Sequence, residues 1–152
     1  MNTREKQAFD QVKTLFKIQT FAVLSTQTND QPYASLVAFA ATPDLEQIIF
    51  LTPATTRKYE NLKHNPKVAI LVNNSMNQPA DIYEAVSVTA TGIAATVEGH
   101  KKEPLLELYL EKHPHLKVFS SAPTTSLVCV TVDRYFMVNQ FQNVIEIQVA
   151  RC

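Results

Sequence analysis

The residues best suited to binding a charged ligand follow an apolar run near the middle of the chain. Residues 48–51 are apolar, Thr52 comes next, and Thr56 then precedes two adjacent cations, Arg57 and Lys58. Amphipathic spacing begins directly after them, which indicates a strand, a short polar turn and the first turn of a helix. A helix start exposes unpaired N–H groups and the positive end of the peptide dipole, so hydroxyls and cations there suit a phosphate dianion. An ordinary capped surface helix with solvated cations is the alternative that these residues leave open.

The other residues that could bind a cofactor or take part in catalysis form no comparable pattern. The only glycines are Gly92 and Gly99, so the chain carries neither a glycine-rich dinucleotide fingerprint nor a P-loop. Cys129 lies in an apolar run typical of a buried strand, where a thiol acts as a small hydrophobic group. No elbow motif supports a hydrolytic serine. The spacing of the histidines predicts no metal site, although His113-Pro114-His115 keeps haem binding open as a minor alternative to a helix end. We therefore assign no metal ligand and no catalytic residue.

Length and composition describe one domain, residues 1–152. Hydrophobic residues make up 45% of the 152, which is enough for a single core. The formal net charge is +0 and no basic stripe is present, so nothing favours nucleic acid. No apolar run is long enough to span a bilayer, and the first residues lack the apolar core of a signal peptide. We expect a soluble, cytoplasmic protein without a membrane partner.

Hydrophobic periodicity predicts three helices among many strands. Apolar residues recur at helical spacing over residues 3–17, 56–64 and 101–113. Strands are expected over residues 21–26, 33–39, 46–51, 68–72, 85–98, 126–132, 135–141 and 144–149. Short connections without regular βαβ alternation favour a closed or nearly closed antiparallel barrel.

The strand over residues 85–98 contains a change of phase. Apolar residues alternate on even numbers up to Ala90 and on odd numbers from Ile93 onward. A one-residue slip turns the side chains over, so this pattern predicts a bulge or sharp bend at Thr91-Gly92. Gly92 is the residue that could hold it, and such a bend curls a sheet into a barrel.

In this order, the elements resemble the flavin-binding split-barrel proteins related to pyridoxamine 5'-phosphate oxidase. The resemblance covers roughly residues 6–141. Thr56-Arg57-Lys58 is similar to the family's Ser/Thr-Arg-Lys phosphate motif. The other matching features are the strand 34–39 after Pro32, the Asn65-Pro66 pair, the bent strand through Gly92 and the strand 135–138.

The resemblance implies a mainly β (α+β) fold, an antiparallel split β-barrel of Greek-key type with about three flanking helices. It also implies a homodimer that binds one FMN per protomer in clefts at the subunit interface. Thr56, Arg57 and Lys58 would hold the phosphate, and Thr52 would lie beside the phosphate or the ribityl chain. The remaining implied contacts are Ser35, Leu36 and Val37 along the ring, largely through backbone groups, Ser87 from the other protomer, and Asn73 or Asn74 as a further polar contact.

The chain also departs from authentic pyridoxamine phosphate oxidases. It has no tryptophan, residues 144–152 lack the family's basic and histidine pattern, and Ser35 stands where those enzymes carry arginine. We therefore expect an FMN-dependent oxidoreductase acting on another small molecule, with an unidentified electron donor. The alternatives are a flavin- or haem-binding protein without turnover, serving electron transfer or storage, and a deazaflavin-dependent reductase.

Overall fold

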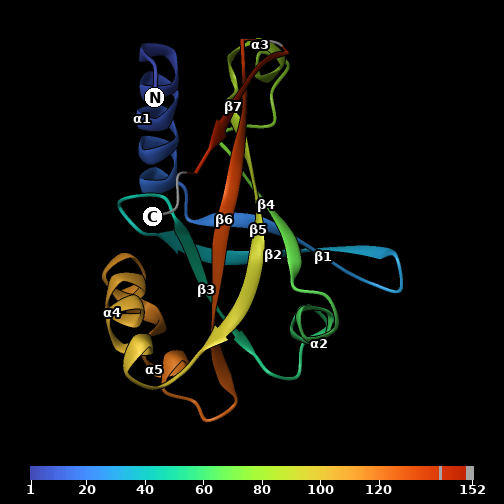
Figure 1. The fold of residues 1–152 in the computed structure, drawn as a ribbon, viewed down its shortest axis with the longest axis vertical. Helices are drawn as coiled ribbons and strands as arrows, with labels where there is room; N and C mark the ends of the chain where they lie inside the picture. The colour runs from blue at the N-terminus through green and yellow to red at the C-terminus, as the bar shows by residue number, and fades with distance from the viewer. Residues whose placement is uncertain (141, 150–152) are drawn as a thin grey trace.

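An antiparallel barrel with one additional strand forms the centre of the molecule. The computed structural model describes residues 1–140 and 142–149. Its strand order is β3-β2-β1-β4-β5-β6-β7, and β3 also pairs with β6, which closes six strands into a barrel (Figure 1). The strands are β1 (Phe21–Thr28), β2 (Gln31–Ala41), β3 (Gln47–Pro53), β4 (Lys67–Asn73), β5 (Ser87–Val97), β6 (Thr125–Asn139) and β7 (Asn143–Gln148). Because β4 lies beside β1 after the β1–β2–β3 meander, the topology is a Greek key. The predicted split barrel is confirmed.

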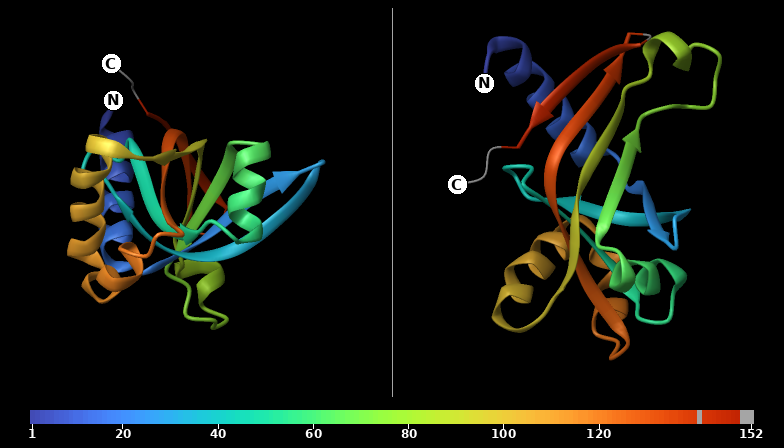
Figure 2. Two further views of the ribbon diagram at one scale, coloured as in Figure 1. Left: turned by 90° about the horizontal axis from the view of Figure 1, so that it is seen from below. Right: turned by 45° about the vertical axis from the view of Figure 1, so that its right-hand side comes forward.

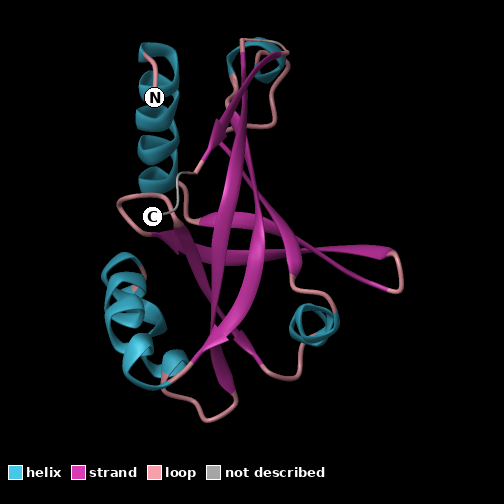
Figure 3. Ribbon diagram, viewed as in Figure 1, coloured by secondary structure: helices cyan, strands magenta, loops and turns pink. Residues whose placement is uncertain are grey.

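Helices flank the barrel instead of alternating with its strands (Figures 2 and 3). The three predicted helices are present as α1 (Thr3–Ile18), α2 (Arg57–His64) and α4 (Lys102–Lys112). Two four-residue helices outside the predicted ones are α3 (Asp81–Glu84) and α5 (Lys117–Ser120), and two 3₁₀ turns are η1 (Gly99–Lys101) and η2 (Pro114–Leu116). No helix in the described residues is long and apolar enough to cross a membrane.

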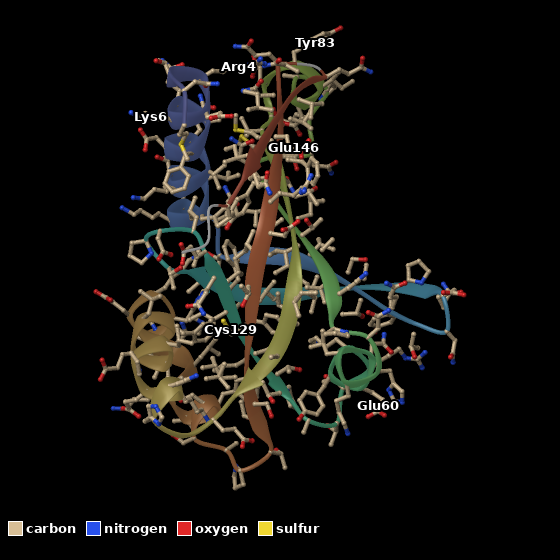
Figure 4. The ribbon with its side chains drawn as sticks, in the orientation of Figure 1. Arg4, Lys6, Glu60, Tyr83, Cys129 and Glu146 are labelled. Atoms are coloured by element: carbon tan, nitrogen blue, oxygen red, sulfur yellow. The ribbon has the colours of Figure 1, made fainter. Side chains whose placement is uncertain are left out.

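The described residues form two apolar cores. The first fills the barrel and includes one face of α1, where the Phe16 ring meets the rings of Phe39 and Tyr135 edge-on at 5.4 and 5.8 Å. The second lies on the outer face of β3 and β6, under α4 and α5, and contains Cys129 (Figure 4). Burial raises the pKa of the Cys129 thiol to about 11, so the predicted role as a buried hydrophobic group is confirmed.

Two side chains of the α4 region anchor it to β2. The Tyr109 hydroxyl donates a hydrogen bond to the Ala38 carbonyl oxygen at 3.0 Å. The His113 Nε2 atom lies 2.7 Å from the Phe39 carbonyl oxygen. Both side chains are only 1% exposed, so these bonds form in a low-dielectric environment. They fix the position of β2 at the point where it begins to pair with β3.

The barrel bends at a register shift between β5 and β6. Thr91 pairs with Arg134 and Gly92 pairs with Val132, so Asp133 has no partner on β5. The shift occurs where the sequence predicts it, but the extra residue belongs to β6.

The prediction that β5 turns over at Gly92 is therefore wrong. Gly92 and Ala94 stay buried, whereas Ile93 is 43% exposed, so even-numbered residues of β5 face inward through the bend. The change of phase occurs in β6. Its inward-facing residues are even-numbered up to Val132 and odd-numbered from Tyr135 onward. Because the bulge interrupts but does not end pairing, the two strands predicted over 126–132 and 135–141 form the single strand β6. Residue 141 of that prediction lies outside the described residues.

Candidate functional site

The turn before α2 is built from hydroxyl groups that cap the helix. Thr56 is the N-cap, and its Oγ1 accepts a hydrogen bond from the Tyr59 N–H at 3.3 Å. Thr56 Oγ1 also lies 2.9 Å from Thr52 Oγ1, and both hydroxyls reach the Pro53 carbonyl oxygen. Thr52 is 0% exposed, so it supports the turn from behind while Thr56 borders the surface. The cap leaves the N–H groups of the first two helical residues for another acceptor.

Arg57 and Lys58 occupy those first two positions of α2. Within the described residues neither side chain forms an ion pair or a side-chain hydrogen bond. The acidic residue of the helix, Glu60, lies instead near Lys63 and His64, 3.9 and 3.6 Å away, toward the other end. Two positive charges without a counterion therefore add to the positive end of the helix dipole.

Tyr33 of β2 lies beneath Arg57. The Arg57 Cζ atom is 5.6 Å from the centroid of the Tyr33 ring, within the range of a cation–π contact. Tyr33 is 39% exposed, so the stacked pair lies at the surface. This contact places the guanidinium next to Tyr33, which precedes Arg57 by 24 residues in the sequence. Sequence reasoning missed Tyr33 because only the fold brings β2 and α2 together.

A buried amide also fixes α2 against the hairpin. The Asn61 side chain is 3% exposed, and its Nδ2 donates to Thr26 Oγ1 at 3.0 Å. Thr26 in turn lies 3.5 Å from the Tyr33 carbonyl oxygen. The chain Asn61–Thr26–Tyr33 therefore sets the position of the helix start relative to β2. The sequence offered only the amphipathic spacing of α2 as a signal for this contact.

The middle of β2 offers a free strand edge close to these cations. β2 pairs with β1 over residues 31–38 but with β3 only over residues 39–41. In the described part of the chain, residues 31–37 thus have a ladder partner on one side only. Ser35, Leu36 and Val37 lie on this edge, with Leu36 63% exposed and Val37 5% exposed. The Ser35 Oγ atom is buried and has no hydrogen-bond partner among the described residues.

Asn73 and Ser87 are not brought to this place within one protomer. They are paired across β4 and β5 and line a cavity of about 420 Å³ beside α3. Figure 4 labels Tyr83 on α3 and Glu60 on α2, at opposite ends of the barrel. The Asn73 side chain accepts hydrogen bonds from Ser75, and Asn74 Oδ1 accepts one from Val86 N. These polar residues could meet the α2 site only across two subunits.

Among the described residues, the neighbouring acid and base on α2 are Glu60 and His64, which lie toward the end of the helix away from Arg57 and Lys58. No group of three histidine, cysteine, aspartate or glutamate side chains gathers there or elsewhere in the part of the chain that the structure describes. The Asp81 carboxylate, whose pKa is lowered by hydrogen bonds from the backbone N–H groups of Gln78 and Met76, closes the loop before α3 instead. The α2 site can therefore bind and orient a ligand, but it presents no group placed for proton transfer.

Comparison with known proteins identifies the family of this chain. The family model described as pyridoxamine 5'-phosphate oxidase matches residues 8–139, which is most of the chain. The chain belongs to the pyridoxamine 5'-phosphate oxidase family. A Schizosaccharomyces pombe protein described as a pyridoxamine 5'-phosphate oxidase homolog is 28% identical over 131 residues, 68% of this chain and 67% of that protein.

Solved structures share the family's fold. A haem-binding protein from Mycobacterium smegmatis has a TM-score of 0.81 at 17% identity, covering 97% of this chain and 59% of that one. An FAD-binding protein from Mesorhizobium loti has a TM-score of 0.66 at 14% identity, covering 86% of this chain and 92% of that one. At such identities these likenesses show the fold alone.

Proposed function

We propose that this protein binds FMN and is an FMN-dependent oxidoreductase acting on a small molecule still to be identified. The observation that carries the proposal is the pair of unpaired cations, Arg57 and Lys58, at a capped helix start beside the free edge of β2. FMN has a phosphate dianion at one end and a flat ring with a polar rim at the other. The family membership of the chain supports the same cofactor class.

The chemistry of the site fits both ends of FMN. The open N–H groups of α2 and its two cations suit the dianion, because charge-assisted hydrogen bonds are the strongest that proteins form. Residues 31–37 have no strand partner on the side away from β1, so this edge suits the ring rim, and the exposed Leu36 side chain suits an apolar ring face. The unpartnered Ser35 hydroxyl adds hydrogen-bonding capacity at the same edge.

We further propose that the cofactor cleft is completed by a second copy of the chain. One row of outward-facing residues crosses five neighbouring strands, and its members are apolar or uncharged: Leu36, Val23, Leu71, Thr89 and Phe136. A nearly uncharged stripe on the outer face of a barrel is what a subunit interface requires. Ser87 and Asn73 of the partner subunit would then supply polar contacts to the ring.

The protein's part in the reaction is binding and orientation. A bound flavin would supply the hydride or electron transfer. The α2 cations would hold its phosphate, and the β2 edge would set the position of the ring. Because no described residue places an acid–base pair beside Arg57 and Lys58, we expect proton exchange to involve solvent or the substrate.

The test is to purify the protein and record its visible spectrum with and without added FMN. We expect a flavin absorbance band that survives gel filtration, or saturable binding on titration. A chain that shows no flavin absorbance and does not bind titrated FMN would exclude the proposal. Mass spectrometry of the extracted cofactor separates FMN from a deazaflavin, whose phosphate would use the same site.

Haem binding without turnover is the second candidate, because a structure with this fold is that of a haem-binding protein. Two of the four histidines are already engaged within the fold: His113 is 1% exposed and bonded to Phe39, and His64 Nδ1 lies 2.9 Å from the Glu60 carbonyl oxygen. His100 and His115 are exposed, so they are the histidines left for haem. Titration with haemin checks it, since a haem absorbance shift without FMN binding would favour this candidate. Stopped-flow mixing with NADH or NADPH then separates turnover from storage.

A further inference from the structure

A second cavity lies on the other side of the barrel from α2. It has a volume of about 330 Å³, within the range of small-ligand sites, and is lined by residues of α1, α4 and the loop joining β2 to β3. Figure 1 shows α1 and α4 on the side of the molecule away from α2. Phe16, Leu45 and Leu108 form part of its apolar lining. Neither Arg57 nor Lys58 lines this cavity, so it is separate from the proposed flavin site.

The charged lining of this cavity is mostly positive. Lys13 and Lys17 of α1 and Lys112 of α4 line it, against the single carboxylate of Glu111. Among the described residues none of these three lysines forms a salt bridge. An apolar cavity with surplus positive charge at its wall is complementary to an anion that has an apolar body.

Lys112 is the most constrained of the three cations. Its Nζ donates to the Phe16 carbonyl oxygen at 2.7 Å, near the end of α1, and lies 3.8 Å from the centroid of the Phe39 ring. One bond to a carbonyl and one ring contact leave an ammonium with further donor capacity. Burial lowers its pKa to about 8, and among the described residues no carboxylate pairs with it.

We propose that this cavity is a second binding site, for a small carboxylate with an apolar body. The carboxylate would pair with Lys112, Lys13 and Lys17, and the apolar body would lie against Phe16, Leu45 and Leu108. One such ligand would supply a counterion for the lysines and would also cover the apolar lining.

Octanoate and 1-octanol are matched probes, because they share a chain length but only the first is charged. We expect octanoate to shift NMR resonances of the cavity methyl groups saturably, with an affinity at least about tenfold higher than that of 1-octanol. Salt should weaken the octanoate binding and leave the 1-octanol binding unchanged. Equal affinity for the two probes, or no saturable shift by either, would overturn the proposal.

A double variant, Lys13→Met and Lys17→Met, tests the charge without touching the Lys112 bond to α1. Both lysines lie outside the buried face of α1, so we expect the variant to fold. Octanoate affinity should fall at least about tenfold and 1-octanol affinity should not change. Lys6→Met, an exposed lysine on the same helix outside the cavity, is the matched control and should bind octanoate as the wild type does. Unchanged octanoate binding in the double variant would show that the cations do not form the site.

The second test measures the protons taken up when octanoate binds. A Lys112 with only a structural role would take up none. The charged or titratable groups around Lys112 are Lys13 and Lys17 of α1, with Glu111 and His113 on its own segment. A bound carboxylate favours the charged ammonium, so octanoate binding near pH 8 should draw protons from the buffer. Calorimetry in buffers of different ionisation enthalpy measures this uptake. Binding without uptake would exclude Lys112 as the partner of the carboxylate.

Discussion

Arg57 and Lys58 are adjacent in sequence, but their side chains have different surroundings in the fold. Arg57 is positioned by the Tyr33 ring beneath it, whereas Lys58 has no ring contact, ion pair or side-chain hydrogen bond among the described residues. An ammonium without a partner in the protein is a stronger indicator of a negatively charged ligand than a guanidinium that already contacts a ring. We therefore place the most direct test of the proposed cofactor at Lys58.

Lys58→Ala should weaken FMN binding at least about tenfold, because a hydrogen bond to a charged group contributes about 1.5–3 kcal/mol. Fluorescence titration of the apoprotein with FMN measures the change. Lys63→Ala is the control, since Lys63 lies in the same helix but pairs with Glu60 away from the helix start. If the two variants bind FMN equally well, the phosphate lies elsewhere.

His113 provides a second prediction at the scale of one residue. Desolvation by burial lowers its pKa, with the nearby Lys112 and His115 acting in the same direction, while the bond to the Phe39 carbonyl oxygen opposes the shift. The folded-state pKa lies below the unfolded value of about 6.5, so the unfolded chain binds the proton more readily. The free energy of unfolding should therefore fall as pH decreases from about 6.5 toward the folded-state pKa.

His113→Gln keeps an N–H donor for Phe39 but removes this titration. Its unfolding free energy should depend less steeply on pH between about 7 and 5, by at most about 1.4 kcal/mol per pH unit. Urea denaturation at several pH values measures the slope. Tyr109→Phe, which removes the neighbouring bond to Ala38, should lower stability by the same amount at each pH. Parallel curves for the wild type and His113→Gln would contradict the assignment.

At the scale of the element, the close contact between β5 and β6 decides where glycine is required. A Cβ atom on Gly92 would lie 2.3 Å from the Thr131 carbonyl oxygen and 2.9 Å from Val130 Cγ1. Both neighbours belong to β6 just before its bulge at Asp133, so neither can move without disturbing the barrel. Gly92 is needed because of this approach, and it is not needed for a turn of β5 itself.

Gly92→Ala should therefore destabilise the protein by about 3 kcal/mol or more, near the upper end of overpacking costs. Gly99→Ala is the matched comparison, because its Cβ would have no atom within 4 Å and only its φ of +70° resists substitution. We expect that variant to lose about 1–2 kcal/mol. Urea unfolding of both variants measures which one loses more stability. If Gly92→Ala loses less unfolding free energy than Gly99→Ala, β5 and β6 can separate at Gly92 at little cost.

At the scale of the whole molecule, the proposed dimer interface and the proposed cofactor site share the outer face of the barrel. The row that contains Leu36 also borders the free edge of β2, so a partner subunit covering the row would close the cleft over the ring. The polar residues at the opposite end of the barrel, Asn73 and Ser87, would join the proposed site only in such a dimer. The proposed dimer and the proposed cofactor are thus physically dependent on each other.

Leu36→Glu should break the dimer, because an unpaired carboxylate buried at an interface costs about 3 kcal/mol or more, over 100-fold in dimer affinity. Sedimentation velocity at micromolar concentration measures the state, and FMN binding should weaken with it. Val118→Glu, at a residue of α5 that is 87% exposed, should stay dimeric and bind FMN normally. A Leu36→Glu protein that remains a dimer would place the interface on another face.

The Greek-key topology was expected only from the family resemblance. The sequence by itself determined the three longer helices, most strands, a closed or nearly closed antiparallel barrel and the position of the cations at the start of α2. These features depend on periodicity and capping, which neighbouring residues encode. Tertiary structure alone decided that Tyr33 lies under Arg57, that residues 31–37 keep a free edge, and that Lys112 faces a cavity. It also decided that Asp133, and not a residue of β5, is the extra one at the bulge. The physical reason is that an apolar pattern indicates that a residue is buried but not which part of the protein covers it. Val97 is an example, because it packs in the outer core under α4 and not inside the barrel.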